Sequence, residues 1–336
     1  MLEIPILLIA IIAIALIFDF TNGVHDSANA IATIVSTKVI SPGLAVVLAA
    51  ILNFMGAFIG IKVAMTIGSG IVNPELVKGC QALVLAALLG AIFWNLLTWY
   101  LGLPSSSSHA LIGGLMGSAI TYHGWVALNW SSILHKIVVP LIVSPLSGFI
   151  VGYLIMLILA WSFCKISPRV NNLIFRKLQL VSSGFMAVSH GMNDAQKTMG
   201  IITLALFIFH EIPAFSVPIW VRIACALAML LGTATGGWRI VKTMGHKIFK
   251  LEPIHGFSAE TSASLVILIA SHLGAPISTT HTISSSVMGV GASKRLSAVR
   301  WGVAGSMIWA WVLTIPASGI VASLFFKIFE YTGIIS

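Results

Sequence analysis

Two short stretches of the chain, GVHDSANA at residues 23–30 and GMNDAQKT at residues 191–198, carry an aspartate at the same position. These aspartates are Asp26 and Asp194, which lie 168 residues apart in segments that are otherwise apolar. A charged side chain in the middle of a bilayer costs about 2.5 to 3.5 kcal/mol on insertion scales, so it is retained where it faces a cavity or a partner. The pair therefore indicates both a repeat and a function.

Two more pairs of motifs follow the first pair in the same order. GLPSSSSH at residues 102–109 is similar to GAPISTTH at residues 274–281, and their final histidines lie 172 residues apart. SPLSG at residues 144–148 is similar to IPASG at residues 315–319. Three anchors in one order, at nearly equal offsets, predict an internal repeat.

The composition indicates where these motifs work. Of the 336 residues, 58% are hydrophobic and 8% are charged, whereas soluble domains carry about 25% charged residues. A chain of this kind has too little polar surface to cover itself against water. This excludes a soluble, a disordered or a nucleic-acid-binding protein despite the net charge of +9. The chain is predicted to be an all-α polytopic membrane protein.

Membrane segments can be read from the apolar runs, because a helix needs about 20 residues to cross a bilayer. Such runs lie near residues 2–35, 43–68, 78–101, 133–163, 179–209, 217–238, 257–273 and 301–328. Two further stretches, 104–121 and 276–292, are rich in Gly, Ser and Thr and are expected to be broken or re-entrant helices at the midplane. If each counts as one net crossing, there are ten crossings and both termini lie outside.

The basic residues indicate the orientation of these segments. Eleven of the 18 Lys and Arg residues fall in three patches, at residues 165–177, 239–250 and 294–300. The positive-inside rule places the patches in the cytoplasm, and ten crossings put all three on one side. If the two short stretches re-entered and returned, one patch would lie on the wrong side.

The two halves are predicted to be inverted relative to one another. Five crossings per half is an odd number, so the second copy enters the membrane from the opposite face. We expect one membrane domain built from a first repeat at residues 1–163, a short cytoplasmic linker at 164–178 and a second repeat at 179–336.

A polar stripe runs along one face of each motif helix, at spacings of three and four residues. In the second copy it contains His190, Asp194 and Lys197. We expect the acidic and amide side chains to hold a coupling cation. The candidates are Asp19, Asn22, Asp26, Asn29, Asn193 and Asp194. The alternative, mainly for the asparagines, is that they only join neighbouring helices.

The Ser/Thr-rich motifs supply the opposite chemistry. A helix that begins just after a proline presents unpaired N–H groups and a partial positive charge, which together bind oxyanions. Two hydroxyl-lined helix starts suit a tetrahedral oxyanion. The predicted substrate-binding residues are Ser105, Ser106, Ser107, Ser108, His109, Ser278, Thr279, Thr280, His281 and Lys197. Serines that merely cap the helices would explain one hydroxyl per motif.

Other polar residues carry weaker signals. His109 and His281 are expected to donate to the anion or to carry a proton. The roles of Glu260 and His190 stay open, although Glu260 is a candidate coupling or gating carboxylate. The three cysteines lack CxxC spacing, and no compact metal motif is present. No disulfide, bound metal or cofactor is therefore expected.

At this point the sequence becomes similar to a known family. NGVHDSANAIAT, SHGMNDAQKTMGI, LPSSSSHALIGG and GFSAETSASLVILIASHLGAPISTTH closely resemble the motifs of the inorganic phosphate transporter (PiT) family, especially those of the bacterial low-affinity phosphate permeases. The resemblance covers nearly the whole chain. It departs from many relatives at residues 164–178, where those proteins insert a long hydrophilic loop.

The resemblance implies a multi-pass protein of the bacterial inner membrane that transports inorganic phosphate together with a cation. Its partners would then be phosphate, the coupling cation and membrane lipid, and the family also suggests a homodimer. Protons are the coupling ion in most bacterial relatives, and sodium in eukaryotic and some prokaryotic ones. Bacterial relatives are also thought to carry neutral metal–phosphate complexes.

The resulting hypothesis places phosphate between the two hydroxyl-rich helix starts, with Asp26 and Asp194 holding the cation beside it. It requires both aspartates to meet in one pocket. The alternatives are a sodium-coupled permease or a permease for another tetrahedral oxyanion such as sulfate. An intramembrane serine hydrolase using Ser108 or Thr280 is disfavoured, because adjacent residues on a helix do not face one another and no G-x-S-x-G elbow is present.

Overall fold

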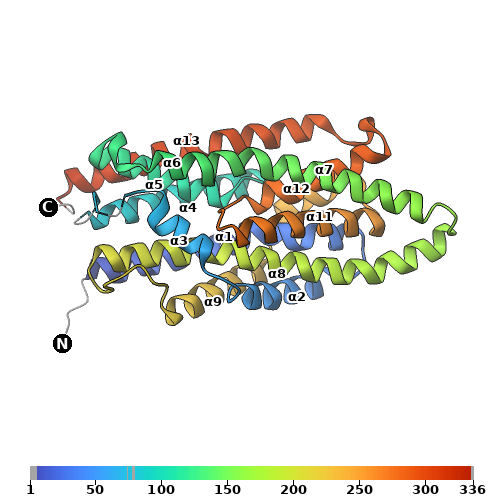
Figure 1. Cartoon of the computed structure of the whole chain (residues 1–336), viewed down its shortest axis with the longest axis horizontal. Helices are drawn as coiled ribbons and strands as arrows, with labels where there is room; N and C mark the ends of the chain where they lie inside the picture. Colours follow the sequence, from blue (N-terminus) through green and yellow to red (C-terminus); the bar gives the residue numbers. More distant parts are fainter. Residues whose placement is uncertain (1–5, 74, 78–79, 334–336) are drawn as a thin grey trace.

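The computed structural model describes residues 6–73, 75–77 and 80–333, and its long helices run along one common axis (Figure 1). Along the chain the helices are α1 (Ile6–Ser36), α2 (Pro42–Gly56), α3 (Lys62–Gly70), α4 (Gln81–Leu101), α5 (Ser107–His123), η1 (Trp125–Ala127), α6 (Trp130–Ile133), η2 (Leu134–Val138), α7 (Val139–Ser162), α8 (Pro168–Ile208), α9 (Ile219–Thr235), α10 (Trp238–Lys242), η3 (Thr243–Lys247), α11 (Pro253–His272), α12 (Thr279–Lys294), η4 (Leu296–Ala298) and α13 (Trp301–Tyr331). The described part of the chain has no β-strand, and Val72 and Leu128 form an isolated bridge.

Fewer helices are long and apolar enough to cross a bilayer than the ten segments that were predicted. In the described residues, five stretches qualify: α1, α4, α6 through α7, α11 and α13. The pair Ile219–Thr235 and Trp238–Lys247, bent by 57°, makes a sixth if it is counted as one span. α8 is 41 residues long, but the polar motif residues within it lower its hydropathy. The prediction of an all-helical membrane protein is confirmed.

The shortfall arises where apolar runs contain chain breaks that hydropathy cannot detect. The predicted run at 43–68 is divided into α2 and α3, and the run at 217–238 ends in the break between α9 and α10. The two stretches rich in Gly, Ser and Thr form α5 and α12, of 17 and 16 residues. Both helices begin at buried residues, so they start inside the protein.

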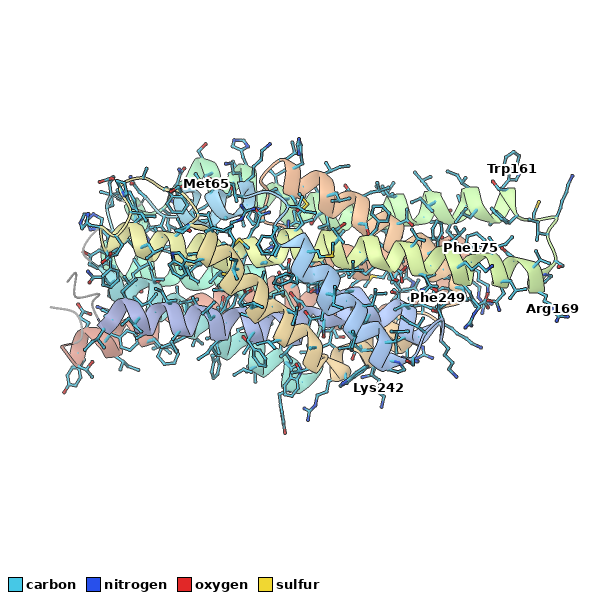
Figure 2. All side chains as sticks on the ribbon, turned by 90° about the horizontal axis from the view of Figure 1, so that it is seen from below. Met65, Trp161, Arg169, Phe175, Lys242 and Phe249 are labelled. Atoms are coloured by element: carbon cyan, nitrogen blue, oxygen red, sulfur yellow. The ribbon has the colours of Figure 1, made fainter. Side chains whose placement is uncertain are left out.

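The short helices pair with the helices that precede them. α5 packs against α4 and α13, and α12 packs against α11 and α7. Figure 1 shows α5 toward the end of the molecule that carries both termini, and α12 toward the end that carries the connection between α7 and α8. Each pair of helices can therefore enter the membrane and leave it on the same side. The conflict with the positive-inside rule that was expected if the two short stretches returned alone does not then arise. Accordingly, Arg169 and Lys242, from two basic patches, lie in the same half of the molecule (Figure 2).

Close packing of α5 against α13 and of α12 against α7 depends on glycine. A Cβ atom at Gly113 of α5 would collide with the backbone of Ile315 in α13, and one at Gly289 of α12 would collide with the backbone of Phe149 in α7. Any larger residue would force the helices apart. Small residues let membrane helices approach closely, and here they fix the positions of the two helices whose starts form the centre.

The apolar core consists of two clusters with a polar layer between them. α1 contributes Leu8, Ile11, Ala15 and Phe18 to one cluster and residues from Ala28 to Ile34 to the other. α8 contributes Met186 and Ala187 to the second cluster and residues from Ala195 onward to the first. Asp26 and Asp194 therefore lie, along their helices, between the residues of the two clusters, and α1 packs against α8.

Candidate functional site

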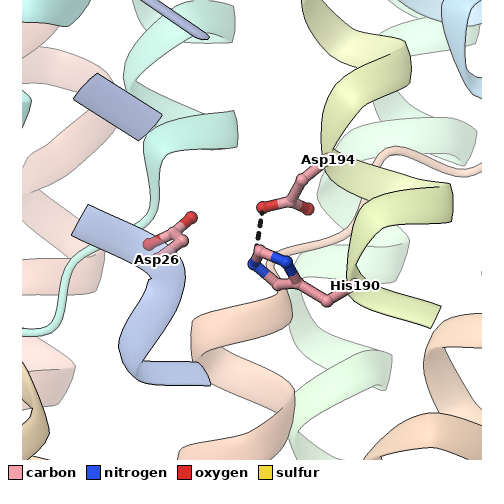
Figure 3. A group of neighbouring side chains, drawn as sticks. All are labelled: Asp26, His190 and Asp194. Carbon is pink, nitrogen blue, oxygen red and sulfur yellow. Dashed lines mark ion pairs between the residues drawn. The ribbon is translucent and has the colours of Figure 1, made fainter. Parts of the chain in front are cut away.

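Asp26 of α1 and Asp194 of α8 meet in the centre of the protein. Together with His190 of α8, they offer ligand atoms that all lie within 4.8 Å of one another, and Figure 3 shows Asp26 across from His190 and Asp194, with one carboxylate oxygen on the side that faces them. The His190 Nε2 atom is 3.3 Å from an Asp194 carboxylate oxygen. All three side chains are buried. The structure therefore brings together the two aspartates that the repeat analysis singled out.

Asp26 has a histidine and a hydroxyl as its hydrogen-bond partners among the described residues. Its Oδ1 atom lies 2.7 Å from His25 Nδ1 and accepts a hydrogen bond of 3.2 Å from the Thr280 hydroxyl. The other ring nitrogen of His25 lies 3.3 Å from the hydroxyls of both Thr98 and Ser105. This chain of contacts links the α1 aspartate to both hydroxyl-rich helix starts, because Ser105 precedes α5 and Thr280 is in α12.

Asp194 has the side chain of Lys197 as its partner. The Lys197 ammonium lies 2.5 Å from Asp194 Oδ1, and it also donates to the Ser108 hydroxyl. The Thr279 hydroxyl donates to the other carboxylate oxygen at 3.2 Å. Lys197 is 0% exposed, as is Asp194. A buried lysine is stable only when paired and hydrogen-bonded, and this contact provides both.

The starts of α5 and α12 have matching caps. The Ser106 hydroxyl accepts from the backbone N–H of His109 at 3.2 Å, and the Ser278 hydroxyl accepts from that of His281 at 3.1 Å. One serine per motif is thus a helix cap, as the structural alternative required. The other hydroxyls have different partners, and that of Ser107 is buried without a hydrogen-bond partner.

The two helix starts contact each other directly. The Ser108 hydroxyl donates to the carbonyl oxygen of Ile277 at 3.2 Å, just before α12 begins. The rings of His109 and His281 have centroids 4.9 Å apart. His281 also stacks on Trp311 of α13 at 4.1 Å. The predicted oxyanion residues of the two motifs therefore form one cluster.

The predicted asparagines differ in what they contact. The Asn29 amide donates to the hydroxyls of Thr279 and Thr280 at 3.1 and 3.0 Å, within the central cluster. The Asn193 amide instead donates to the Ser271 hydroxyl of α11 at 2.8 Å. Asn193 therefore joins α8 to α11, which is the helix-joining alternative, and is not directed at the aspartate pair.

Asp19 and Asn22 lie about two turns and one turn before Asp26 on α1. Asp19 faces the side chains of Asn22 and Thr198, but no hydrogen bond of normal geometry to a described residue satisfies its carboxylate oxygens or the amide atoms of Asn22. Both side chains are buried. Buried polar atoms without partners are costly, so this part of the stripe is suited to bind water, an ion or substrate.

Several contacts could not be found from the sequence. No compact metal motif is present, yet Asp26, His190 and Asp194 form a cluster that could hold a metal ion, because its members come from two helices. The Lys197 ammonium on Asp194 opposes a further divalent charge there. The contact between His190 and Asp194 could be predicted, because His190 lies four residues before Asp194 on the same face of the helix. Thr98 of α4 gave no signal.

Glu260 of α11 lies away from this cluster in a polar site of its own. Its Oε1 atom accepts hydrogen bonds from the Thr33 hydroxyl at 2.6 Å and the Gln179 amide at 3.0 Å. Its Oε2 atom accepts from the Ser182 hydroxyl. Glu260 is buried and is held between α1, α8 and α11, which the sequence did not indicate.

Comparisons with known proteins agree with one another. A model of the phosphate transporter family matches residues 22–172 and, in a second match, residues 165–322. The chain is 49% identical over 320 residues to a probable low-affinity inorganic phosphate transporter of Rhizobium meliloti, with 95% of each chain covered. It is 47% identical to a protein of the same description from Bacillus subtilis, covering 95% of this chain and 96% of that protein. A solved structure described as the sodium-dependent phosphate transporter matches with a TM-score of 0.90 and 25% identity, over 97% of this chain and 99% of the other.

Proposed function

Because the chain belongs to the phosphate transporter family, we propose that it imports inorganic phosphate across the bacterial inner membrane by symport with a cation. The observation that carries this proposal is the convergence of two buried aspartates with two hydroxyl-rich helix starts. The relatives are described as phosphate transporters and not as enzymes, and the Ser108 hydroxyl donates to the Ile277 carbonyl and not to the adjacent histidine that a hydrolase would need as its base. A hydrolase is therefore excluded.

Phosphate binds, in this proposal, between the starts of α5 and α12. The backbone N–H groups at these two helix starts and the partial positive charge of each helix favour an oxyanion. The Ser107 hydroxyl is buried and without a partner, so it is free to donate to a bound anion. Lys197 contacts Ser108 of the same cluster and supplies positive charge. Phosphate is carried alone or as a neutral complex with a divalent metal ion.

Coupling follows from the balance of charge in the buried site. An anion alone in a region of low dielectric constant is unfavourable, and so is a carboxylate that lacks a counter-charge. Among the described residues, Asp26 contacts His25 and the Thr280 hydroxyl, so a cation at Asp26 and phosphate beside it stabilise each other. Substrate and cation therefore bind together more readily than either binds alone, which is what symport requires.

The two halves are proposed to form inverted repeats, at residues 1–163 and 179–336 with the linker 164–178 between them. The two successive family matches, which begin at residues 22 and 165, support this division. So does the arrangement of the pairs α4–α5 and α11–α12, which lie toward opposite ends of the molecule (Figure 1). Rocking of one repeat against the other would expose the central site to each side in turn.

The access route on the outer side is proposed to be a cavity of about 650 Å³. It is lined by Lys62, Thr66, His135, Lys136 and Gly274, among others. Met65, which also lines it, lies in the half of the molecule opposite Arg169 (Figure 2). Gly274 begins the loop that leads to Ser278 and the start of α12, so this basic cavity is adjacent to the proposed phosphate site.

The coupling ion is proposed to be a proton and not sodium, as in most bacterial relatives that the sequence resembles. The test is uptake of labelled phosphate by the purified protein in proteoliposomes, with either a pH gradient or a sodium gradient. We expect the pH gradient to drive uptake equally well in sodium and choline salts. Uptake that needs the sodium gradient would assign sodium as the coupling ion.

Substrate choice is tested in the same proteoliposomes. Sulfate at the concentration of the labelled phosphate should leave uptake unchanged, and displacement by sulfate would favour a general oxyanion permease. The absence of phosphate uptake under every gradient would contradict the proposed function itself. The homodimer implied by the resemblance stays a prediction.

A further inference from the structure

We infer that the Lys197 ammonium is a tethered cation that fills, beside Asp194, a position that a mobile metal cation such as Na⁺ would otherwise take. In consequence, of the two central aspartates only Asp26 exchanges a mobile cation during transport. This inference rests on the proposed function, because it assigns the origin of the positive charge at each aspartate of that site.

The contacts of Lys197 are those of a bound cation in an oxygen-lined position. Its Nζ atom lies 2.5 Å from Asp194 Oδ1 and contacts the Ser108 hydroxyl, while Thr279 donates to the second oxygen of the same carboxylate. The side chain is fully buried. Carboxylate and hydroxyl oxygens are the ligands that hard cations prefer, so removal of the ammonium would leave oxygens suited to an ion such as Na⁺.

Asp26 has no tethered ammonium in direct contact among the described residues. The residue three positions after Asp194 is Lys197, whereas the residue three positions after Asp26 is Asn29, which is neutral and donates to Thr279 and Thr280. The described residues include no lysine or arginine paired with Asp26. The two aspartates therefore occupy equivalent places in their motifs but differ in how their charge is balanced.

This difference has a consequence for coupling. An ammonium held by a covalent side chain stays with Asp194 throughout the cycle, so Asp194 needs no ion from solution and releases none. Asp26 must be neutralised anew each time phosphate is loaded. Lys197 would thereby set the number of mobile cations at the pair of aspartates to one. Its contact with Ser108 also keeps positive charge at the edge of the phosphate cluster.

The test replaces Lys197 with the residue found at the corresponding place in the first motif. Lys197→Asn removes the ammonium and adds an amide oxygen, and Lys197→Gln is a second neutral variant. Lys197→Arg keeps the charge. The matched control is Lys327→Asn, which removes a lysine from an exposed ion pair with Glu330. Each purified protein is unfolded by heat in sodium chloride and, at the same ionic strength, in choline chloride.

We expect sodium to raise the Tm of Lys197→Asn and Lys197→Gln by at least about 2 °C relative to choline, because an ion that binds only the folded state stabilises it. The wild type, Lys197→Arg and Lys327→Asn should show equal Tm values in the two salts. In proteoliposomes with a pH gradient, phosphate uptake by the neutral variants should be lower in choline than in sodium, whereas wild-type uptake should be equal in both.

Two results would overturn the inference. One is a neutral variant whose Tm is the same in sodium and in choline, because sodium would then not replace the ammonium. Neutral variants that fail to fold in both salts count as the same result. The other is an Arg variant with the same sodium response as the neutral variants. Failure of the proposed function is a separate result, because the wild type would then take up no phosphate while the Tm comparison could still be made.

Discussion

The imidazole rings of His109 and His281 lie 4.9 Å apart, where the start of α5 meets the start of α12. Each histidine follows its helix cap by three residues, and its backbone N–H donates to that cap. The contact therefore fixes one helix start relative to the other. His281 in turn stacks on Trp311, whose indole donates to the carbonyl oxygen of Pro104 at 2.9 Å.

Replacing His281 should therefore loosen the phosphate site and also remove one of its candidate donors. His281→Leu removes the stacking on Trp311 and the ring contact with His109. Aromatic pairs contribute about 0.5–1.5 kcal/mol, and 1.4 kcal/mol corresponds to about a tenfold change in rate. We expect the initial rate of phosphate uptake in proteoliposomes to fall by up to about tenfold. The exposed His246→Leu is the control, and an equal loss in both variants would contradict this account.

Replacing either central aspartate should stop transport, but the two replacements should lower the Tm of the protein by different amounts. Asp26→Asn and Asp194→Asn should each abolish concentrative phosphate uptake while the protein still inserts into the membrane. Asp194→Asn also leaves Lys197 buried without a counter-charge, which costs about 3–5 kcal/mol. Asp26→Asn strands no lysine, so its Tm should fall less.

Thermal unfolding of the purified variants, with the exposed Glu330→Gln as control, checks this order. The double variant Asp194→Asn with Lys197→Asn should recover much of the stability that Asp194→Asn loses, because the two residues interact directly. Normal uptake by both single aspartate variants would refute the assigned role of the pair.

The sequence was sufficient to predict residues whose chemistry does not fit their surroundings. Asp26 and Asp194 are charges in apolar helices, and the Ser/Thr-rich motifs are polar where the flanking segments are not. Such residues are costly in a membrane unless they meet one another, and the duplication gave two copies of each signal. Their meeting in one cluster therefore followed from general physics and from the order of the motifs.

Other features depend on contacts between helices far apart in the chain. Asn193, like Asn29, is an asparagine in a polar motif within an apolar segment, but its side chain contacts Ser271 of α11. Whether such a side chain faces the central cluster or a neighbouring helix is decided by packing, which the sequence does not give. Nothing in the sequence distinguishes Thr98 from other residues of its apolar helix, because its role depends on the contact with His25 of α1. The chain breaks between α2 and α3 and between α9 and α10 lie within apolar runs, so hydropathy predicted whole spans there.

Glu260 should be needed as a carboxylate. It accepts hydrogen bonds from Thr33 and Gln179 on one oxygen and from Ser182 on the other. Glu260→Gln puts an amide donor opposite another donor at one of these positions, and a buried polar group left unsatisfied costs about 1–3 kcal/mol. We expect a lower Tm and slower phosphate uptake.

A matched variant separates the charge at this position from its hydrogen bonds. Ser182→Ala removes one donor and keeps the carboxylate, so it should lower the Tm less than Glu260→Gln does. If Glu260→Gln had wild-type Tm and uptake, the hydrogen bonds from Thr33, Gln179 and Ser182 to the carboxylate would contribute neither to stability nor to transport. The comparison is made by thermal unfolding and by uptake in proteoliposomes.

The basic outer cavity should affect how readily phosphate reaches the site and not how fast it is carried. Lys136 is exposed and lines the cavity together with Lys62, and a cleft lined by one sign of charge raises the local concentration of the opposite ion. Lys136→Gln should raise the KM for phosphate about twofold at low salt with little change in kcat. The difference from wild type should shrink as salt is added, because the Debye length falls from about 30 Å at 0.01 M to about 3 Å at 1 M. The control is Lys327→Gln, at an exposed ion pair outside the cavity, which should leave the KM unchanged. Two outcomes would show that the cavity does not concentrate the anion: a KM that rises equally in both variants, or a rise in Lys136→Gln that is independent of salt.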